Sequence, residues 1–205
     1  MVDSAAAHRS RARRPLTRER IAQAALAVAD RDGATAVTMR RVARELGVEA
    51  MSLYHHIRDR EDLLDGLAET MVRAGLPNPG PSRDAGATLA AFARGIRNTG
   101  LAHPQAFQLV GLRPLRNPEA TASIAALLSA LSSAGLAPEQ AVSAYRTTAA
   151  FARGFVLSEI AGLTYGRDAG VPVPDAIAPY AASLADDTEH TFETGLEAII
   201  RGLTG

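Results

Sequence analysis

The feature that most constrains the fold is a helix break at Gly47. The stretch RRVARELGVEAMSLYHHI, residues 40–57, has the apolar spacing of an amphipathic helix that stops at this glycine and restarts two residues later. Glycine can take the left-handed conformation that turns the chain without a Cβ penalty. Four apolar residues are spaced to hold the two helices together: Val42, Leu46, Val48 and Leu53. The pattern therefore predicts a helix-turn-helix whose second helix leaves one face free to enter a major groove.

The free face of this second helix carries groups that suit contact with DNA. Ser52 and the imidazoles of His55 and His56 can hydrogen-bond to base edges or phosphates, and Ala50 or Met51 can touch a thymine methyl group. The phenol of Tyr54 suits a phosphate contact, and Arg40 and Arg60 would flank the groove and hold the backbone. The alternative is a plain corner between two helices with solvent-exposed histidines.

Charge is distributed unevenly along the chain. Residues 1–60 hold twelve arginines against seven acidic residues, whereas the remainder holds ten arginines against fifteen, so a net charge of zero hides a basic first third. This asymmetry favours a polyanionic partner for the N-terminal part, although a run of solvated arginines would give the same count. We expect residues 1–14 to form a disordered basic arm.

Hydrophobic periodicity predicts an all-α protein, because no alternating strand pattern of any length occurs. Residues 15–75 are expected to form a helix-turn-helix DNA-binding domain, a three-helix bundle followed by a linking helix. The Pro- and Gly-rich stretch at 76–86 should separate it from a larger helical ligand-binding and dimerisation domain, residues 76–205. The expected helices cover 17–33, 38–47, 49–56, 59–74, 87–102, 104–111, 118–134, 138–162 and 181–202.

Composition excludes several classes of function. All 22 basic residues are arginine, so a lysine-dependent phosphate loop or Schiff base is impossible. There is no cysteine, which rules out disulfides and thiolate metal sites and suits a cytoplasmic protein. No apolar run reaches the roughly 18 residues of a membrane span. No catalytic motif or paired-carboxylate arrangement nominates an active centre, so we expect neither an enzyme nor a cofactor.

The chain resembles the TetR family of bacterial regulators. The resemblance is densest at RRVARELGV, SLYHHI and DREDLL within residues 16–67. It continues through LVGLRP (109–114), residues 134–162 and FETGLEAIIRGL (192–203), which are similar to the regulatory domain of the tetracycline repressor subgroup. The subgroup's operator-contacting positions fall on Thr38, Arg40, Ala50, Met51, Ser52, Tyr54, His55, His56 and Arg60.

This resemblance implies an all-helical homodimer with one DNA reader per subunit and an inducer pocket in each second domain. The dimer interface would use the helices near 138–162 and 181–202. Small residues there could allow close helix approach: Ala141, Ala144, Ala149 and Ala152. An apolar stripe would lie exposed on a monomer: Leu196, Ile199, Ile200 and Leu203.

One departure from the subgroup bears on the ligand. Tetracycline-binding members carry a histidine metal ligand two residues before the glycine of the LGTRP segment, where this chain has Leu109. We therefore expect no metal site and no binding of magnesium–tetracycline. Because aromatic residues at helical spacing can equally be core, the pocket residues are candidates only: Phe92, Phe107, Leu109, Leu112, Arg113, Tyr145, Phe151, Phe155 and Glu159. Arg113 is the expected polar anchor.

The function that these features favour is that of a sequence-specific transcriptional repressor. It would bind a palindromic operator in double-stranded DNA and be released by an unknown small-molecule ligand. A ligand-independent DNA-binding regulator or activator is the alternative, and an enzyme is a more distant one. A well-packed second domain without a cavity would favour the ligand-independent reading.

Overall fold

The computed structural model describes residues 15–75, 84–116, 118–162, 175–176, 178–180 and 188–204. Within these ranges the regular structure is entirely helical, as the periodicity predicts. The predicted basic arm and most of the predicted 76–86 loop lie outside the described residues. None of the described helices combines the length and apolarity that crossing a membrane requires.

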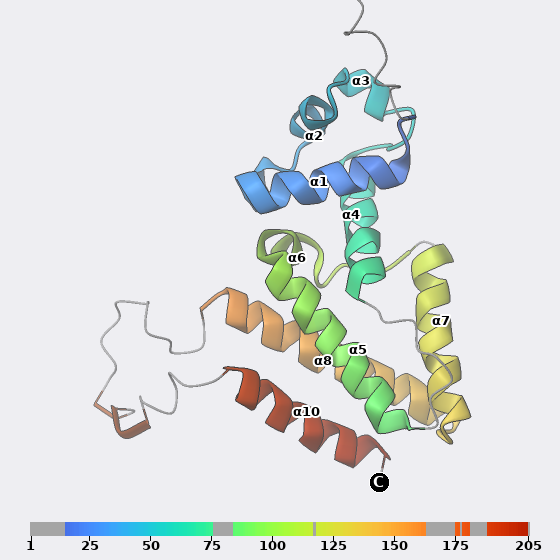
Figure 1. Ribbon diagram of the computed structural model, residues 1–205, viewed down its shortest axis with the longest axis vertical. Coiled ribbons are helices and arrows are strands. Elements are labelled where there is room, and N and C mark those ends of the chain that lie inside the picture. The colour runs from blue at the N-terminus through green and yellow to red at the C-terminus, as the bar shows by residue number, and fades with distance from the viewer. Residues whose placement is uncertain are drawn as a thin grey trace, which may run out of the picture.

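Four helices and a short 3-10 turn form the N-terminal unit, at the upper end of Figure 1. Thr17 and Thr38 begin the first two helices, because each side-chain hydroxyl accepts a hydrogen bond from a backbone N–H three residues later, at 3.3 and 3.2 Å. Asp59 Oδ1 likewise accepts from the Asp62 N–H at 2.8 Å at the start of the fourth helix. The elements are α1 (Arg18–Asp32), η1 (Ala34–Ala36), α2 (Met39–Leu46), α3 (Ala50–Leu53) and α4 (Arg60–Gly75).

The third helix is shorter than the sequence predicts. Regular α-helix ends at Leu53, and residues 54–56 continue as a turn rather than as part of the expected 49–56 helix. Two hydrogen bonds between residues three positions apart tighten the turn. They run from the Tyr54 N–H to Met51 O at 3.2 Å and from the His56 N–H to Leu53 O at 2.9 Å. Tyr54, His55 and His56 therefore lie beyond the helix end.

The second unit begins at α5 (Ala85–Ala102) and lies below α1 in Figure 1, with α4 running down into it. Helices α5 and α8 (Pro138–Ile160) cross at its centre, α10 (Thr188–Thr204) packs along both of them, and α7 (Pro118–Ser133) covers α8 at the other side. The last expected helix is described from Thr188, and residues 181–187 lie outside the described residues. The second unit also contains α6 (Pro104–Val110) and η2 (Ala178–Tyr180).

The core of the N-terminal unit continues into the second unit through α6. Buried residues of α1 to α4 form one apolar cluster with Ala106, Phe107 and Val110 of α6 and with Val156 of α8. At the end of α4, a Cβ added to Gly75 would lie 2.4 Å from Thr99 Oγ1, so only glycine permits this approach to α5. The two units are consequently packed through shared core rather than joined by a free linker.

The sequence predicts that small residues of α8 and apolar residues of α10 face a second copy of the chain, and this prediction is wrong in part. Ala141, Ala144, Ala149 and Ala152 are all buried inside the protomer, where α8 packs against α5, α7 and α10. Leu196 is 1% exposed, and Ile200 and Leu203 pack against the same protomer's core. Their spacing reflects intramolecular helix packing, which sequence periodicity cannot distinguish from an interface between two copies.

Candidate DNA-binding surface and ligand cavity

The turn between α2 and α3 has the geometry that the sequence predicts. Gly47 lies in the left-handed region, with φ 66° and ψ 36°, and its N–H donates to the carbonyls of Ala43 and Arg44. The Val48 N–H donates to Ala43 O at 3.0 Å, which closes the end of α2. Val42 and Leu53 are both fully buried. These contacts fix the angle of α3 against the rest of the unit.

The side chains that follow this turn are presented to solvent. Met51 is 72% exposed and Tyr54 48% exposed, which is unusual for large apolar groups, and His55 and His56 are also exposed. Ser52 is half-buried, and Ala50 packs against the core cluster from its edge. Of the predicted contact residues after the turn, Met51, Tyr54, His55 and His56 are therefore accessible to a partner, whereas Ala50 and Ser52 are partly buried.

The arginines near this surface divide into paired and unpaired groups. Arg41 bonds to Asp32 at 2.6 Å and to Glu45 at 3.1 Å, and Arg31 shares both carboxylates, so neither cation is free for a phosphate. Arg40 is exposed, and no ion pair to another described residue neutralises it. Among the described residues Arg60 has one distant ion-pair partner, Glu61 at 3.9 Å.

Sequence reasoning missed Arg44, which lines the same concave surface as Arg40 and Ser52. It is exposed and, like Arg40, without an ion pair among the described residues. The signal was present in the sequence, because residues four apart share a helix face. Thr38 also lies at this surface, but its hydroxyl accepts the capping hydrogen bond from the Arg41 N–H, so its side chain also stabilises α2.

Asp62 is a buried carboxylate that ties α4 to α1. One oxygen pairs with Arg18 at 2.7 Å, and the other accepts from the Arg58 N–H at 2.9 Å. Burial alone would raise the pKa of Asp62, but the hydrogen bonds from Arg58 and Arg18 outweigh it and hold the pKa below its usual value. The ionised carboxylate thus fixes the start of the helix that leads into the second unit.

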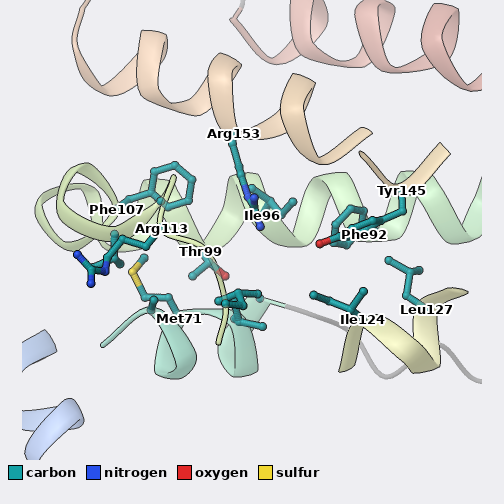
Figure 2. A pocket seen from close by; sticks show the side chains of 16 residues that line it. Met71, Phe92, Ile96, Thr99, Phe107, Arg113, Ile124, Leu127, Tyr145 and Arg153 are labelled. Atoms are coloured by element: carbon teal, nitrogen blue, oxygen red, sulfur yellow. The ribbon is translucent and has the colours of Figure 1, made fainter. Parts of the chain in front are cut away.

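A cavity lies between the end of α4 and the helices of the second unit, with a volume of about 60 Å³ (Figure 2). Its walls are predominantly apolar, and the rings of Phe92 and Tyr145 lie 5.7 Å apart at one end. The groups that line it are Ala68, Met71, Val72, Gly75, Phe92, Ile96, Thr99, Phe107, Val110, Gly111, Arg113, Leu115, Ile124, Leu127, Tyr145 and Arg153. Apolar walls with a few polar groups are the usual lining of a small-molecule site, although most such sites are larger, at roughly 300–1,000 Å³.

Four of the predicted pocket residues line this cavity: Phe92, Phe107, Arg113 and Tyr145. The other five lie elsewhere. Leu109 packs against the N-terminal core, and Leu112 is 70% exposed. Phe151 stacks on Phe192 of α10 with 5.5 Å between ring centroids, and Phe155 meets the same ring edge-on at 5.3 Å.

Glu159, the last of these five, pairs with Arg97 at 2.9 Å, and Arg97 also reaches Glu189 and lies 5.1 Å from the Phe192 ring. Sequence reasoning missed the contribution of α4 through Met71 and Gly75, and also missed Arg153 of α8. Arg153 is one helical turn beyond Ala149 and two beyond Tyr145, so it follows the same face of α8, but sequence alone does not show that this face borders a hollow.

Arg113 connects the cavity to α4. Its guanidinium bonds to Asp65 at 2.7 Å and to Glu61 at 2.9 Å, and these hydrogen bonds raise the pKa of Arg113 above its usual value against the opposing effect of burial. Two further contacts join the ends of α5 and α6 to the N-terminal unit. His103 Nδ1 lies 2.8 Å from Asp30, and Gln105 Oε1 accepts from the Ala34 N–H at 3.2 Å.

No cluster of three metal-ligating side chains occurs within the part of the chain that the structure describes. Leu109 contributes an aliphatic side chain to the apolar cluster, and leucine offers no lone pair to a cation. The chemistry available in the described cavity is therefore burial of an apolar body together with hydrogen bonding and cationic contact.

Comparisons with known proteins agree with this architecture. The family model for bacterial regulatory proteins of the tetR family matches residues 21–67, and that for the tetracyclin repressor-like C-terminal domain matches residues 78–205. The HTH-type transcriptional repressor DrrR1 of Streptomyces coeruleorubidus is 32% identical, over 92% of this chain and 77% of that protein. The tetracycline repressor protein class A from transposon 1721 of Escherichia coli is 32% identical, over 89% of this chain and 88% of that protein.

The structure of the Streptomyces coelicolor TetR family protein ActR in complex with (S)-DNPA superposes with a TM-score of 0.76. It is 28% identical and covers 93% of this chain and 98% of its own. Both family models, the helix-turn-helix and the helical second unit lead to the same assignment. This chain belongs to the TetR family of bacterial regulatory proteins.

Proposed function

We propose that this protein is a dimeric repressor that binds a palindromic operator through α3 of each protomer and leaves it when a small molecule occupies the cavity. The family assignment and the curated repressors among its relatives make the chain a ligand-responsive DNA-binding regulator. The finer proposal rests on one observation, which is the exposed surface of Met51, Tyr54, His55 and His56 beside the unpaired Arg40.

DNA binding would combine two kinds of contact on this surface. Met51 and the histidines would face base edges, because they lie at and beyond the end of α3 where a groove-bound helix meets the bases. Arg40, Arg44 and Arg60 would hold phosphates on either side. Since Arg41 and Arg31 are already paired with Asp32 and Glu45, their charges would add little to affinity.

Dimerisation would use the outward faces of α8 and α10 rather than the buried alanines. Val142 is 43% exposed, and Ala150 and Gly154 follow it on the solvent side of α8. Ala198 and Gly202 are exposed on α10. A Cβ added at Gly154 or Gly202 would meet no atom of the described residues within 4 Å, so there is room for a second copy to approach closely. The interface would place two copies of α3 about 34 Å apart, one turn of DNA.

Ligand binding would release the operator DNA by moving the segment that carries Arg113. A ligand that enters between Phe107 and Met71 would push on α6 and on the end of α4 together, since both line the cavity. Arg113 would transmit this movement to Asp65 and Glu61 on α4, and α4 begins at the DNA-binding unit. The ligand can shift the equilibrium only as far as its affinities for the two arrangements differ. The cavity itself favours this reading over ligand-independent binding.

The ligand class of relatives gives a starting point for screening. The ActR protein has been crystallised in complex with actinorhodin as well as with (S)-DNPA. We propose that this chain also takes a mainly apolar organic molecule, without a metal, because Leu109 stands where the tetracycline binders have a histidine. Titration with tetracycline and Mg²⁺ should show no metal-dependent binding.

The proposal is tested by selecting bound fragments from genomic DNA with the purified full-length protein. We expect a palindromic sequence, and we expect Arg40→Met to weaken binding to it by roughly tenfold through loss of a phosphate contact. Arg94→Met is the matched control, because it removes an arginine that pairs with Glu193 in the second unit. Recovery of no preferred sequence, or equal losses in the two variants, would contradict the assignment of this surface.

A further inference from the structure

We propose that the cavity is built for an aromatic anion and that Arg153 supplies its counter-charge. This inference rests on the proposed role of the cavity as the effector site and names the class of ligand that it takes. It differs from the expectation drawn from sequence, in which Arg113 is the polar anchor. The distinction depends on how each of the two arginines that line the cavity is paired.

The charge of Arg113 is already neutralised by carboxylates of α4. Its Nη2 and Nε both donate to Asp65 Oδ1, at 2.7 and 3.1 Å, and its Nη1 donates to Glu61 at 2.9 Å. Two carboxylates therefore surround one guanidinium. A ligand anion at this point would meet the negative charge of α4 as well as the cation, so Arg113 offers little net attraction.

Arg153, unlike Arg113, is not neutralised by a carboxylate of the described residues. It is half-buried on α8, and its side chain lines the cavity. Figure 2 shows it extending from α8 towards the centre of the cavity, beside Ile96. The other arginines that are buried or half-buried in the described second unit, Arg97 and Arg113, each bond to two carboxylates.

An unpaired guanidinium against an apolar wall is costly, because part of its hydration is lost without replacement. A ligand oxyanion that bonds to it would restore the lost interactions, and guanidinium pairs especially well with planar carboxylates. The cation thus selects for a negative group on the ligand and selects against a positive one. This preference is a property of the cavity and does not require a metal.

The remaining walls specify the body of the ligand. Phe92 and Tyr145 form an aromatic end, and Ile124 and Leu127 of α7 lie along the same side in Figure 2. Such walls favour a flat ring system, which gains both buried apolar area and ring contacts. Because a cavity of roughly 150 Å³ is what a single benzene ring occupies, a ring system would have to widen this cavity of about 60 Å³, as the proposed movement of α4 and α6 would do. Thr99 adds a hydroxyl that bonds to no other described residue and can meet a polar substituent. The ligand class is consequently an aromatic carboxylate or phenolate.

The inference is tested with two probes that differ in charge but hardly in shape, 2-naphthoate and 2-naphthamide. Calorimetric titration of the full-length protein should show the carboxylate binding roughly tenfold more tightly than the amide, as a charge-assisted hydrogen bond implies. Arg153→Met should abolish this preference, whereas Arg153→Lys should retain much of it. Arg146→Met is the matched control on the same helix, exposed and outside the cavity, and should keep the full preference.

Equal affinity for the two probes in the native protein, a preference that survives Arg153→Met, or failure of both probes to bind would each overturn the inference. These outcomes are separate from the failure of the proposed function. If the native protein recovers no preferred DNA sequence, the repressor assignment fails, but the ratio of naphthoate to naphthamide affinities still decides whether Arg153 recognises an anion.

Discussion

The left-handed backbone conformation of Gly47 lets us predict how much a substitution at this position lowers the free energy of unfolding. A Cβ placed on this residue would meet no atom within 4 Å, so the cost of a substitution comes from the backbone conformation and not from a clash. Holding an alanine at φ 66° costs about 1–2 kcal/mol. The lower entropy of the unfolded chain offsets part of this, about 0.4–1 kcal/mol. We therefore expect Gly47→Ala to lower the free energy of unfolding by about 1 kcal/mol.

Two further substitutions at Gly47 make the reasoning refutable. Asparagine tolerates the left-handed region, so Gly47→Asn should cost less than Gly47→Ala, and the β-branched Gly47→Val should cost most. Thermal unfolding followed by circular dichroism, at one fixed protein concentration, should show melting temperatures falling by roughly 2–4 °C per kcal/mol for a chain of this size. If Gly47→Ala is as stable as the native protein, or if asparagine is the worst substitution, the turn does not impose the conformation described.

Three other predictions follow from particular contacts. Tyr54→Phe should weaken binding to operator and to unrelated DNA by the same factor in a fluorescence-anisotropy titration, and a changed sequence preference would show that its hydroxyl reads bases. A double-mutant cycle of Arg113→Met and Asp65→Asn in urea unfolding should give a coupling energy of about 1–2 kcal/mol, because the pair is mostly shielded, and additive losses would contradict the ion pair. The pKa of Asp62 is lowered in the folded state, so its ionised carboxylate stabilises the native state above about pH 4. This stabilisation is lost as the pH falls below about 4 and through the folded-state pKa. The free energy of unfolding of Asp62→Asn, measured across this acidic pH range, should therefore depend less on pH than that of the native protein.

The local elements could be predicted from sequence because their causes are local. Thr17, Thr38 and Gly47 cap helices through neighbouring backbone groups, and each does so in the structure. The exposed surface at Met51 and Tyr54 followed from the same reasoning, since a helix locked on one side must present the other. Residue spacing is sufficient wherever the relevant contact lies within a few positions along the chain.

The cavity depends on long-range packing, and there sequence reasoning was less successful. Phe151 and Phe155 were candidates for a ligand site, but α10 covers them, and periodicity carries no information about which helix packs on which face. Sequence reasoning selected Arg113 as the polar anchor and missed Arg153, which also lines the cavity. The positions of Asp65 and Glu61, 48 and 52 residues away from Arg113, are what separate a neutralised arginine from an unpaired one.

Changing the spacing between the two half-sites tests whether two copies of α3 read them on one face of DNA. The measurement is the dissociation constant of the purified protein for the selected palindrome and for the same palindrome with five base pairs inserted at its centre, at one salt concentration. Half a helical turn places the second half-site on the opposite face. We predict that affinity falls from about 10⁻⁸ M or tighter towards the non-specific range of about 10⁻⁴–10⁻⁶ M. Equal affinity for the two duplexes would show that the two copies of α3 do not read two half-sites on one face of DNA.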